Sequence, residues 1–109
     1  MKPNLFYILL SLAAGERHGS AVMRDVLAMT DGKLRLWPAT LYGSLEELAE
    51  QGWIEELEDP RDRPPGESEK KRYYRLTRAG RRALAAETER LEGLVRVARA
   101  RTRRGEEAR

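Results

Sequence analysis

The 109-residue chain is long enough for one domain, and 36% of its residues are charged, against about 25% in typical soluble domains. It has no cysteine and one histidine, which excludes disulfides, thiolate metal sites and clusters of histidine ligands. The net charge of +3 is unevenly spread, because residues 1–76 hold 11 basic and 13 acidic residues whereas residues 77–109 hold 10 and 5. This balance permits a nucleic-acid partner without requiring one.

The N-terminal third of the chain predicts two helices. Asn4 is a candidate N-cap for the first, which ends at Gly15 and is too short to span a membrane. With no basic leader before it, we expect a cytoplasmic chain that does not contact a membrane. This helix is apolar on nearly every side, so part of it, including Phe6, is expected in a subunit interface. Periodic apolar residues predict a second helix from His18 to about Met29.

The central segment predicts a third helix. Residues 34–36 alternate in polarity and indicate a very short strand before it. Pro38 suits the first position of a helix, where a missing N–H costs nothing, and Gly52 ends the helix. Three leucines at helical spacing define its buried face: Leu41, Leu45 and Leu48.

Two strands are expected next, over residues 53–58 and 69–76. The segment between them, residues 59–68, holds three prolines and a glycine and is expected to form the tip of a hairpin. Alternation along the second strand puts Tyr74 in the core and leaves Tyr73 exposed. Basic residues gather at the start of this strand: Lys70, Lys71 and Arg72.

Thr77 is expected to cap a last helix that runs from near Arg78 to about Arg104, with a frayed tail from Gly105. Such a helix is about 40 Å long, more than one compact domain covers. We therefore expect its apolar stripe, together with Phe6, to pack against a second copy of the chain. The alternative is a solvated helix held by ion pairs such as Glu87 to Arg90. The stripe comprises Leu84, Leu91, Leu94, Val95 and Ala98.

The order of these elements is that of a winged helix, a mainly α fold with a small β-hairpin. Residues 1–76 are predicted to form a winged helix-turn-helix DNA-binding domain, and residues 77–109 a C-terminal dimerisation helix and tail. In such a module the third helix fits the major groove and its first turns reach base edges. The hairpin follows the phosphate backbone.

Several spaced motifs resemble the PadR-like transcriptional regulators, over roughly residues 5–84. The resemblance implies a winged-helix dimer that binds operator-like DNA and has no enzyme activity. The single C-terminal helix resembles the compact branch of that family. The matching residues are His18-Gly19, Ala39-Thr40-Leu41-Tyr42, Leu45, Leu48, Gly52-Trp53-Ile54, Arg72-Tyr73-Tyr74-Arg75-Leu76-Thr77 and Gly80.

Three groups of residues are predicted to contact DNA. The first turns of the third helix would reach the groove, the start of the second helix would offer backbone N–H groups to a phosphate, and the basic cluster of the hairpin would bind phosphates. Ordinary structural roles are the alternatives: Tyr42 packing on the hairpin, Ser20 or His18 capping a helix, and solvated charges. The groups are Thr40, Tyr42 and Gly43; His18, Gly19 and Ser20; and Lys70, Lys71 and Arg72.

An acidic run opposes this interpretation, since seven acids and no basic residue lie between residues 46 and 59. Members of the family that the chain resembles often carry a basic residue where this chain has Glu47. Acids facing phosphates repel them. We therefore expect DNA contact only in the first turns of the third helix, with no base readout beyond Ser44.

The sequence as a whole indicates a sequence-specific, homodimeric repressor that binds a two-fold-related operator in double-stranded DNA. No cofactor or metal site is expected, and whether a small-molecule effector exists is left open. The alternative function is a winged-helix protein-interaction module that never touches DNA. An enzyme is not supported, because no nucleophile–base pair, ligand set or phosphate-binding glycine loop is present. Trp37 and Trp53 are expected in the core.

Overall fold

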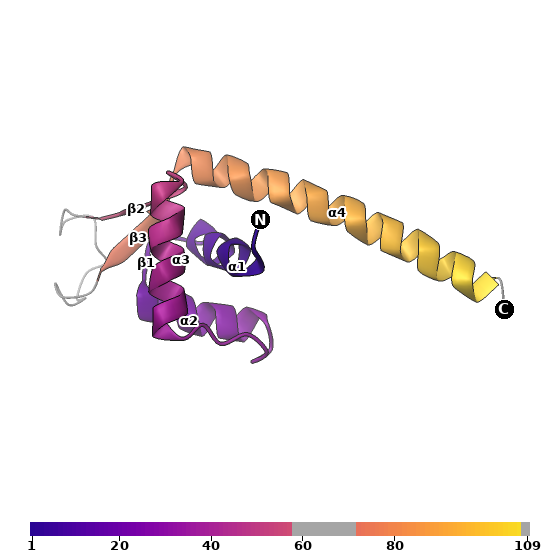
Figure 1. The fold of residues 1–109 in the computed structure, drawn as a ribbon, viewed down its shortest axis with the longest axis horizontal. Helices are drawn as coiled ribbons and strands as arrows, with labels where there is room; N and C mark the ends of the chain where they lie inside the picture. Colours follow the sequence, from indigo (N-terminus) through magenta and orange to yellow (C-terminus); the bar gives the residue numbers. More distant parts are fainter. Residues whose placement is uncertain (58–71, 108–109) are drawn as a thin grey trace.

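The computed structural model describes residues 1–57 and 72–107. The predicted hairpin tip, with Lys70 and Lys71, lies outside the described residues. The described residues form four helices and three short strands, which confirms the predicted mainly helical fold with a small sheet (Figure 1). In chain order they are α1 (Pro3–Ala13), β1 (Arg17–His18), α2 (Gly19–Met29), α3 (Pro38–Glu50), β2 (Ile54–Glu56), β3 (Tyr73–Leu76) and α4 (Arg78–Glu107).

The core lies where α1, α2 and α3 pack together against one face of the sheet. The leucine stripe of α3 is buried as predicted, with Leu41 and Leu48 fully inaccessible. α1 is buried through four apolar side chains, consistent with its central place in Figure 1. It begins at Pro3 with Lys2 in the capping position, so the prediction of Asn4 as N-cap is wrong. Proline takes the first helical position because it has no N–H to satisfy.

The sheet is antiparallel in the order β1-β3-β2. The strand predicted at residues 34–36 is absent, because residues 17–18 occupy the edge of β3 instead. The alternation at 34–36 still reports burial, since Leu36 is buried and Arg35 exposed. Tyr73 is buried rather than exposed, because the extra strand brings the ring of His18 edge-on to it, with the ring centroids 5.4 Å apart.

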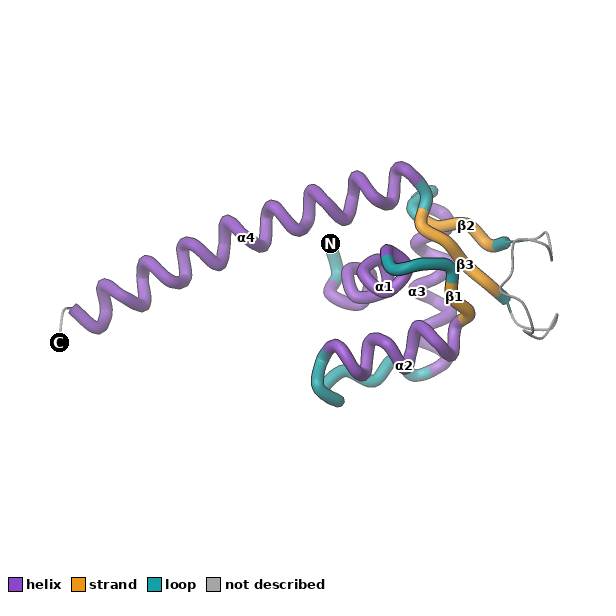
Figure 2. Tube along the Cα trace, turned by 180° about the vertical axis from the view of Figure 1, so that it is seen from behind, coloured by secondary structure: helices purple, strands orange, loops and turns teal. Residues whose placement is uncertain are grey.

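α4 extends well beyond the rest of the molecule (Figures 1 and 2), whose principal extents are 61 × 28 × 24 Å. Its cap is the predicted one, since the Thr77 hydroxyl accepts a hydrogen bond from the Gly80 N–H at 3.0 Å. It continues through Gly105 to Glu107, so the helix runs further than predicted, and the rest of the predicted frayed tail lies outside the described residues. Leu84 packs against the core, whereas Leu94 and Val95, further along α4, are 52% and 48% exposed.

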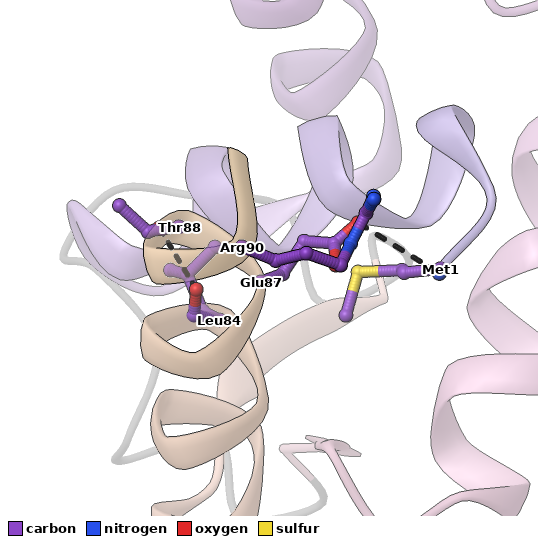
Figure 3. Close-up of polar contacts among 5 residues, drawn as sticks. All are labelled: Met1, Leu84, Glu87, Thr88 and Arg90. Carbon is purple, nitrogen blue, oxygen red and sulfur yellow. Dashed lines mark hydrogen bonds and ion pairs between the residues drawn. The ribbon is translucent and has the colours of Figure 1, made fainter. Parts of the chain in front are cut away.

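A buried carboxylate joins α4 to the start of the chain (Figure 3). Glu87 accepts hydrogen bonds from Arg90 at 2.7 and 2.9 Å and lies 3.7 Å from the terminal ammonium of Met1. The hydrogen bonds from Arg90, aided by the charge of the ammonium, hold the pKa of Glu87 below its ordinary value. The pair that helical spacing indicated is therefore present, and it stands where α4 passes α1.

Gly80 marks a close approach between two stretches of backbone. The Thr77 N–H donates to the Trp53 carbonyl at 3.0 Å, and the Thr77 hydroxyl donates to the Gly52 carbonyl at 2.7 Å. These bonds draw the first turn of α4 onto the turn after α3. A Cβ at Gly80 would collide with the Trp53 carbonyl oxygen and come within 2.9 Å of its carbon. Only glycine fits here without a backbone shift.

Replacing Gly80 by alanine is expected to cost about 1–3 kcal/mol of unfolding free energy, because the added methyl must displace backbone. Gly93→Ala is the matched control on the same helix, where a Cβ meets nothing within 4 Å. It should stabilise the chain by about 0.5–1 kcal/mol, the usual gain for alanine over glycine in a helix. Urea unfolding measures both. A loss of equal size in both variants would contradict the role given to Gly80.

Candidate nucleic-acid interface

The first turns of α3 present an open surface. Trp37 has extended backbone and stands before Pro38, and the Leu41 N–H closes the first turn by donating to the Trp37 carbonyl at 2.9 Å. Burial of Leu41 directs the residues on either side of it outward. Thr40, Tyr42 and Gly43 are all exposed. The structure thus places these three predicted contact residues on one accessible end of α3.

At the start of α2, one of the predicted phosphate-contact residues serves as the helix cap. His18 caps the helix, with Nδ1 accepting from the Ala21 N–H at 3.2 Å, and it is only 7% exposed. Gly19 is buried as well. Of the three predicted residues here, only Ser20 is exposed. His18 therefore holds the local backbone in place, the structural role that the sequence left open for it.

Two of the predicted contact residues meet each other. A Cβ at Gly19 would lie 3.0 Å from the Tyr42 hydroxyl and 3.3 Å from Cδ2 of Leu41. The ring of Tyr42 thus lies against the start of α2, and the missing side chain of Gly19 makes room for it. This contact gives a physical reason for both residues, which the sequence motifs presented as separate signals.

The wing is the hairpin formed by β2 and β3. A groove of about 650 Å³ lies between α3 and these two strands. Arg72 lies in this groove and donates two hydrogen bonds to Glu56, at 2.8 and 2.9 Å. Its guanidinium also stands 5.9 Å from the ring centre of Tyr74. The carboxylate of Glu56 raises the pKa of Arg72, and burial raises that of Tyr74. Arg72, predicted to bind phosphate, is therefore already engaged with an acid. The groove is lined by Ala39, Tyr42, Gly43, Leu45, Glu46, Ala49, Glu56, Arg72 and Tyr74.

Ion pairs neutralise much of the acidic run in α3 and β2. Glu47 pairs with Lys2 at 3.2 Å, and Glu55 pairs with Arg75 at 2.6 Å. The second pair follows from the sheet register, in which these two residues face each other. The pair of Lys2 and Glu47 joins residues 45 positions apart, so it could not be predicted from local sequence. Three of the acids that the sequence predicted to turn away from DNA, Glu47, Glu55 and Glu56, thus have partners within the module.

Trp37 corrects an expectation from the sequence. It is 65% exposed rather than buried in the core, and the guanidinium carbon of Arg35 lies 5.5 Å from its ring centre. Trp53 is partly buried against the core, as expected.

Within residues 1–57 and 72–107, no group of three or more potential metal-ligating side chains comes together. Among the helices described, none is both long and apolar enough to cross a membrane.

Residues 8–86 match the profile of the family described as "Transcriptional regulator PadR-like family". The chain belongs to this family. This PadR-like protein is accordingly a transcriptional regulator by family and not an enzyme. The resemblance drawn from the sequence motifs is confirmed, over nearly the same residues. A search of curated proteins found no significant match.

Solved structures share the fold at low sequence identity. A transcriptional regulator from Clostridium thermocellum is 24% identical with a TM-score of 0.72, and the match covers 87% of this chain and 85% of that one. PadR of Bacillus subtilis, solved in complex with operator DNA, is 21% identical with a TM-score of 0.65, covering 80% and 47%. F93 from STIV, a winged-helix DNA-binding protein, is 18% identical with a TM-score of 0.69, covering 87% and 94%. The winged-helix fold is confirmed.

The contact between Gly19 and Tyr42 is testable by a double-mutant cycle. Gly19→Ala should be better tolerated when Tyr42 is first changed to phenylalanine, because the nearest clashing atom, the hydroxyl, is then gone. Coupling of about 0.5–1 kcal/mol in the unfolding free energy is expected for two residues in contact. Chemical denaturation of the two single variants and the double variant measures it. Additive effects would show that the Tyr42 hydroxyl does not limit the space at Gly19.

Proposed function

We propose that this PadR-like regulator binds double-stranded DNA as a homodimer and represses transcription by occupying a two-fold-related operator. The observation that carries the proposal is the exposed first turn of α3, held out from the core by its buried leucine face. An α-helix fits the major groove, and side chains near its start reach base edges. Thr40 offers a hydroxyl there, and Gly43 allows a close approach of the helix.

The related structures support this function. PadR of Bacillus subtilis was solved with operator DNA, and F93 is described as a winged-helix DNA-binding protein. In our proposal the exposed Ser20 and the wing residues Lys70 and Lys71, which lie outside the described part, position the module on phosphates. Arg72 would join them only by leaving or sharing its bonds with Glu56.

We propose a second copy of the chain because an apolar surface between α1 and α4 is left exposed. A largely apolar groove of about 390 Å³ runs between α1 and α4, and Phe6, Leu91 and Val95 are among the residues that line it. Next to it, Leu94 is half exposed. The α4 of a second chain, related by a two-fold axis, would cover this surface on both copies at once. The predicted interface residues Leu84 and Ala98 lie along the same stripe.

A protein-interaction module without DNA binding is the rival function. It is favoured by Glu46 and Glu50, exposed acids of α3 for which the described residues provide no ion-pair partner. The two functions differ in one measurable respect. Binding to phosphates releases counterions and therefore weakens steeply as salt is added, whereas a protein partner imposes no such dependence on any duplex.

DNA binding is tested first by selecting duplexes from a random pool and titrating the best one at several salt concentrations. Thr40→Ala should then lower the ratio of operator to scrambled-duplex affinity by roughly tenfold to a hundredfold, the usual value of one base-edge contact. Affinity for the scrambled duplex should hardly change, because phosphate contacts carry that binding. A wild-type chain with no salt-dependent affinity for any duplex would favour the rival function.

The dimer is tested by placing a charge on the stripe. Val95→Glu should give a monomer at micromolar concentration, because it buries a carboxylate in an apolar contact. Ala100→Glu is the matched control, since it adds the same group about 140° around the helix at an exposed position, and it should remain a dimer. Sedimentation velocity distinguishes the two. If both variants stay dimeric, the interface lies elsewhere.

A further inference from the structure

The segment between α2 and α3 presents three side chains to solvent in a regular row. Buried or partly buried Leu34 and Leu36 alternate with the exposed Lys33, Arg35 and Trp37. The exposed residues alternate with the inward-facing leucines, and the guanidinium carbon of Arg35 lies 5.5 Å from the ring centre of Trp37. We call Lys33, Arg35 and Trp37 the outward row.

The backbone of this segment is held firmly. The Thr30 hydroxyl donates to the Val26 carbonyl at 2.8 Å and accepts from the Leu34 N–H at 3.0 Å. Leu36 is 2% exposed and anchors the far end in the core. The outward row therefore stands on a fixed support, so its side chains do not have to be ordered from a flexible loop before they bind.

Charge singles out the same segment. Elsewhere in the winged module, the cations that the structure describes are largely engaged: Lys2, Arg72 and Arg75 pair with acids, and Arg17 donates to the Ser11 carbonyl. Within the described residues, neither Lys33 nor Arg35 makes an ion pair. Arg35 instead lies over the ring of Trp37, a cation–π arrangement that leaves the charge uncompensated.

The exposure of Trp37 indicates that its ring contacts a binding partner. At 65% it has the largest exposed fraction among the described large hydrophobic side chains, and tryptophan is normally well covered. Its indole offers one N–H donor beside a broad apolar surface. A surface that combines this ring with two cations suits a polyanion with apolar sugars between its charges.

The outward row also lies beside the predicted DNA-reading turn. Trp37 and Thr40 are three residues apart at the start of α3, which makes them neighbours on the same side of the helix. The Leu41-to-Trp37 hydrogen bond fixes that turn. A duplex in contact with Thr40 therefore comes within one helical turn of Trp37.

We propose that the outward row is a further DNA-binding element, in which Lys33 and Arg35 bind backbone phosphates and Trp37 packs on the adjoining deoxyribose. This inference rests on the proposed DNA-binding function. It would give α3 phosphate contacts independent of those on the wing. The contacts carry no base information, so they should act alike on every sequence.

The first experiment uses the two tryptophans. In a Trp53→Phe variant, Trp37 is the only indole of the chain and reports directly on the row. Its emission should be quenched or shifted as a labelled random-sequence duplex is added, and should recover when salt dissociates the complex. Emission unchanged while anisotropy shows the duplex bound would overturn the proposal.

The second experiment measures salt slopes. Lys33→Ala and Arg35→Ala should each lower the slope of log affinity against log salt by about 0.9, the value for one phosphate contact. Arg104→Ala is the control, because it removes the same charge from the last turn of α4 and should leave the slope unchanged. Trp37→Ala should weaken random and operator duplexes by the same factor. Equal slopes in the wild-type chain, Lys33→Ala, Arg35→Ala and Arg104→Ala would overturn the proposal.

The outcomes separate the two claims. A wild-type chain that binds no duplex contradicts the proposed function and this inference together. A wild-type chain that binds with a steep salt slope, while the variants of the row bind equally well, contradicts the inference alone. If Trp37→Ala changes the sedimentation of the chain and leaves DNA affinity intact, the row contacts a second protein copy instead.

Discussion

The attachment of the first turn of α4 to the turn after α3 is the contact on which the rest of the structure depends. Thr77 bonds to two successive carbonyls, and the missing side chain of Gly80 lets the two backbones touch. β2 begins directly after this turn and β3 ends directly before Thr77. One small cluster therefore fixes α3, both wing strands and α4 relative to one another. Without it, α3 and α4 would have no defined position relative to each other.

Local neutralisation resolves the apparent conflict between an acidic module and an anionic partner. Pairs such as Lys2–Glu47 and Arg75–Glu55 contribute little stability at the surface. Their effect is on the field around the module: each removes one negative charge that a phosphate would otherwise meet. The cations in these pairs are then less available to bind a phosphate. In the described module, the cations without an ion-pair partner include Lys33 and Arg35, just before α3 and its exposed first turn, and Arg24 on α2.

Sequence patterns predicted what depends on periodicity and local chemistry. The bounds of α3, the leucine stripe and the Thr77 cap follow from spacing and side-chain type within a few residues. The predictions were wrong where a segment distant in the sequence determines the strand pairing or the burial of a residue. Residues 17–18 rather than 34–36 complete the sheet, and burial of Tyr73 follows from that exchange. In the candidate site, the exposed α3 residues were predictable, whereas the inward turn of His18 and the exposure of Trp37 depend on tertiary packing.

α4 is an unbroken helix of 30 residues without proline, attached at one end and extending free of its own module at the other. In the proposed dimer it would act as a ruler between two recognition helices. Each residue added to or removed from such a rod changes its length by about 1.5 Å and its orientation by about 100°. Relatives with shorter or longer rods could therefore not simply shift their operator half-sites apart. They would also have to change the face of the duplex that each half-site presents.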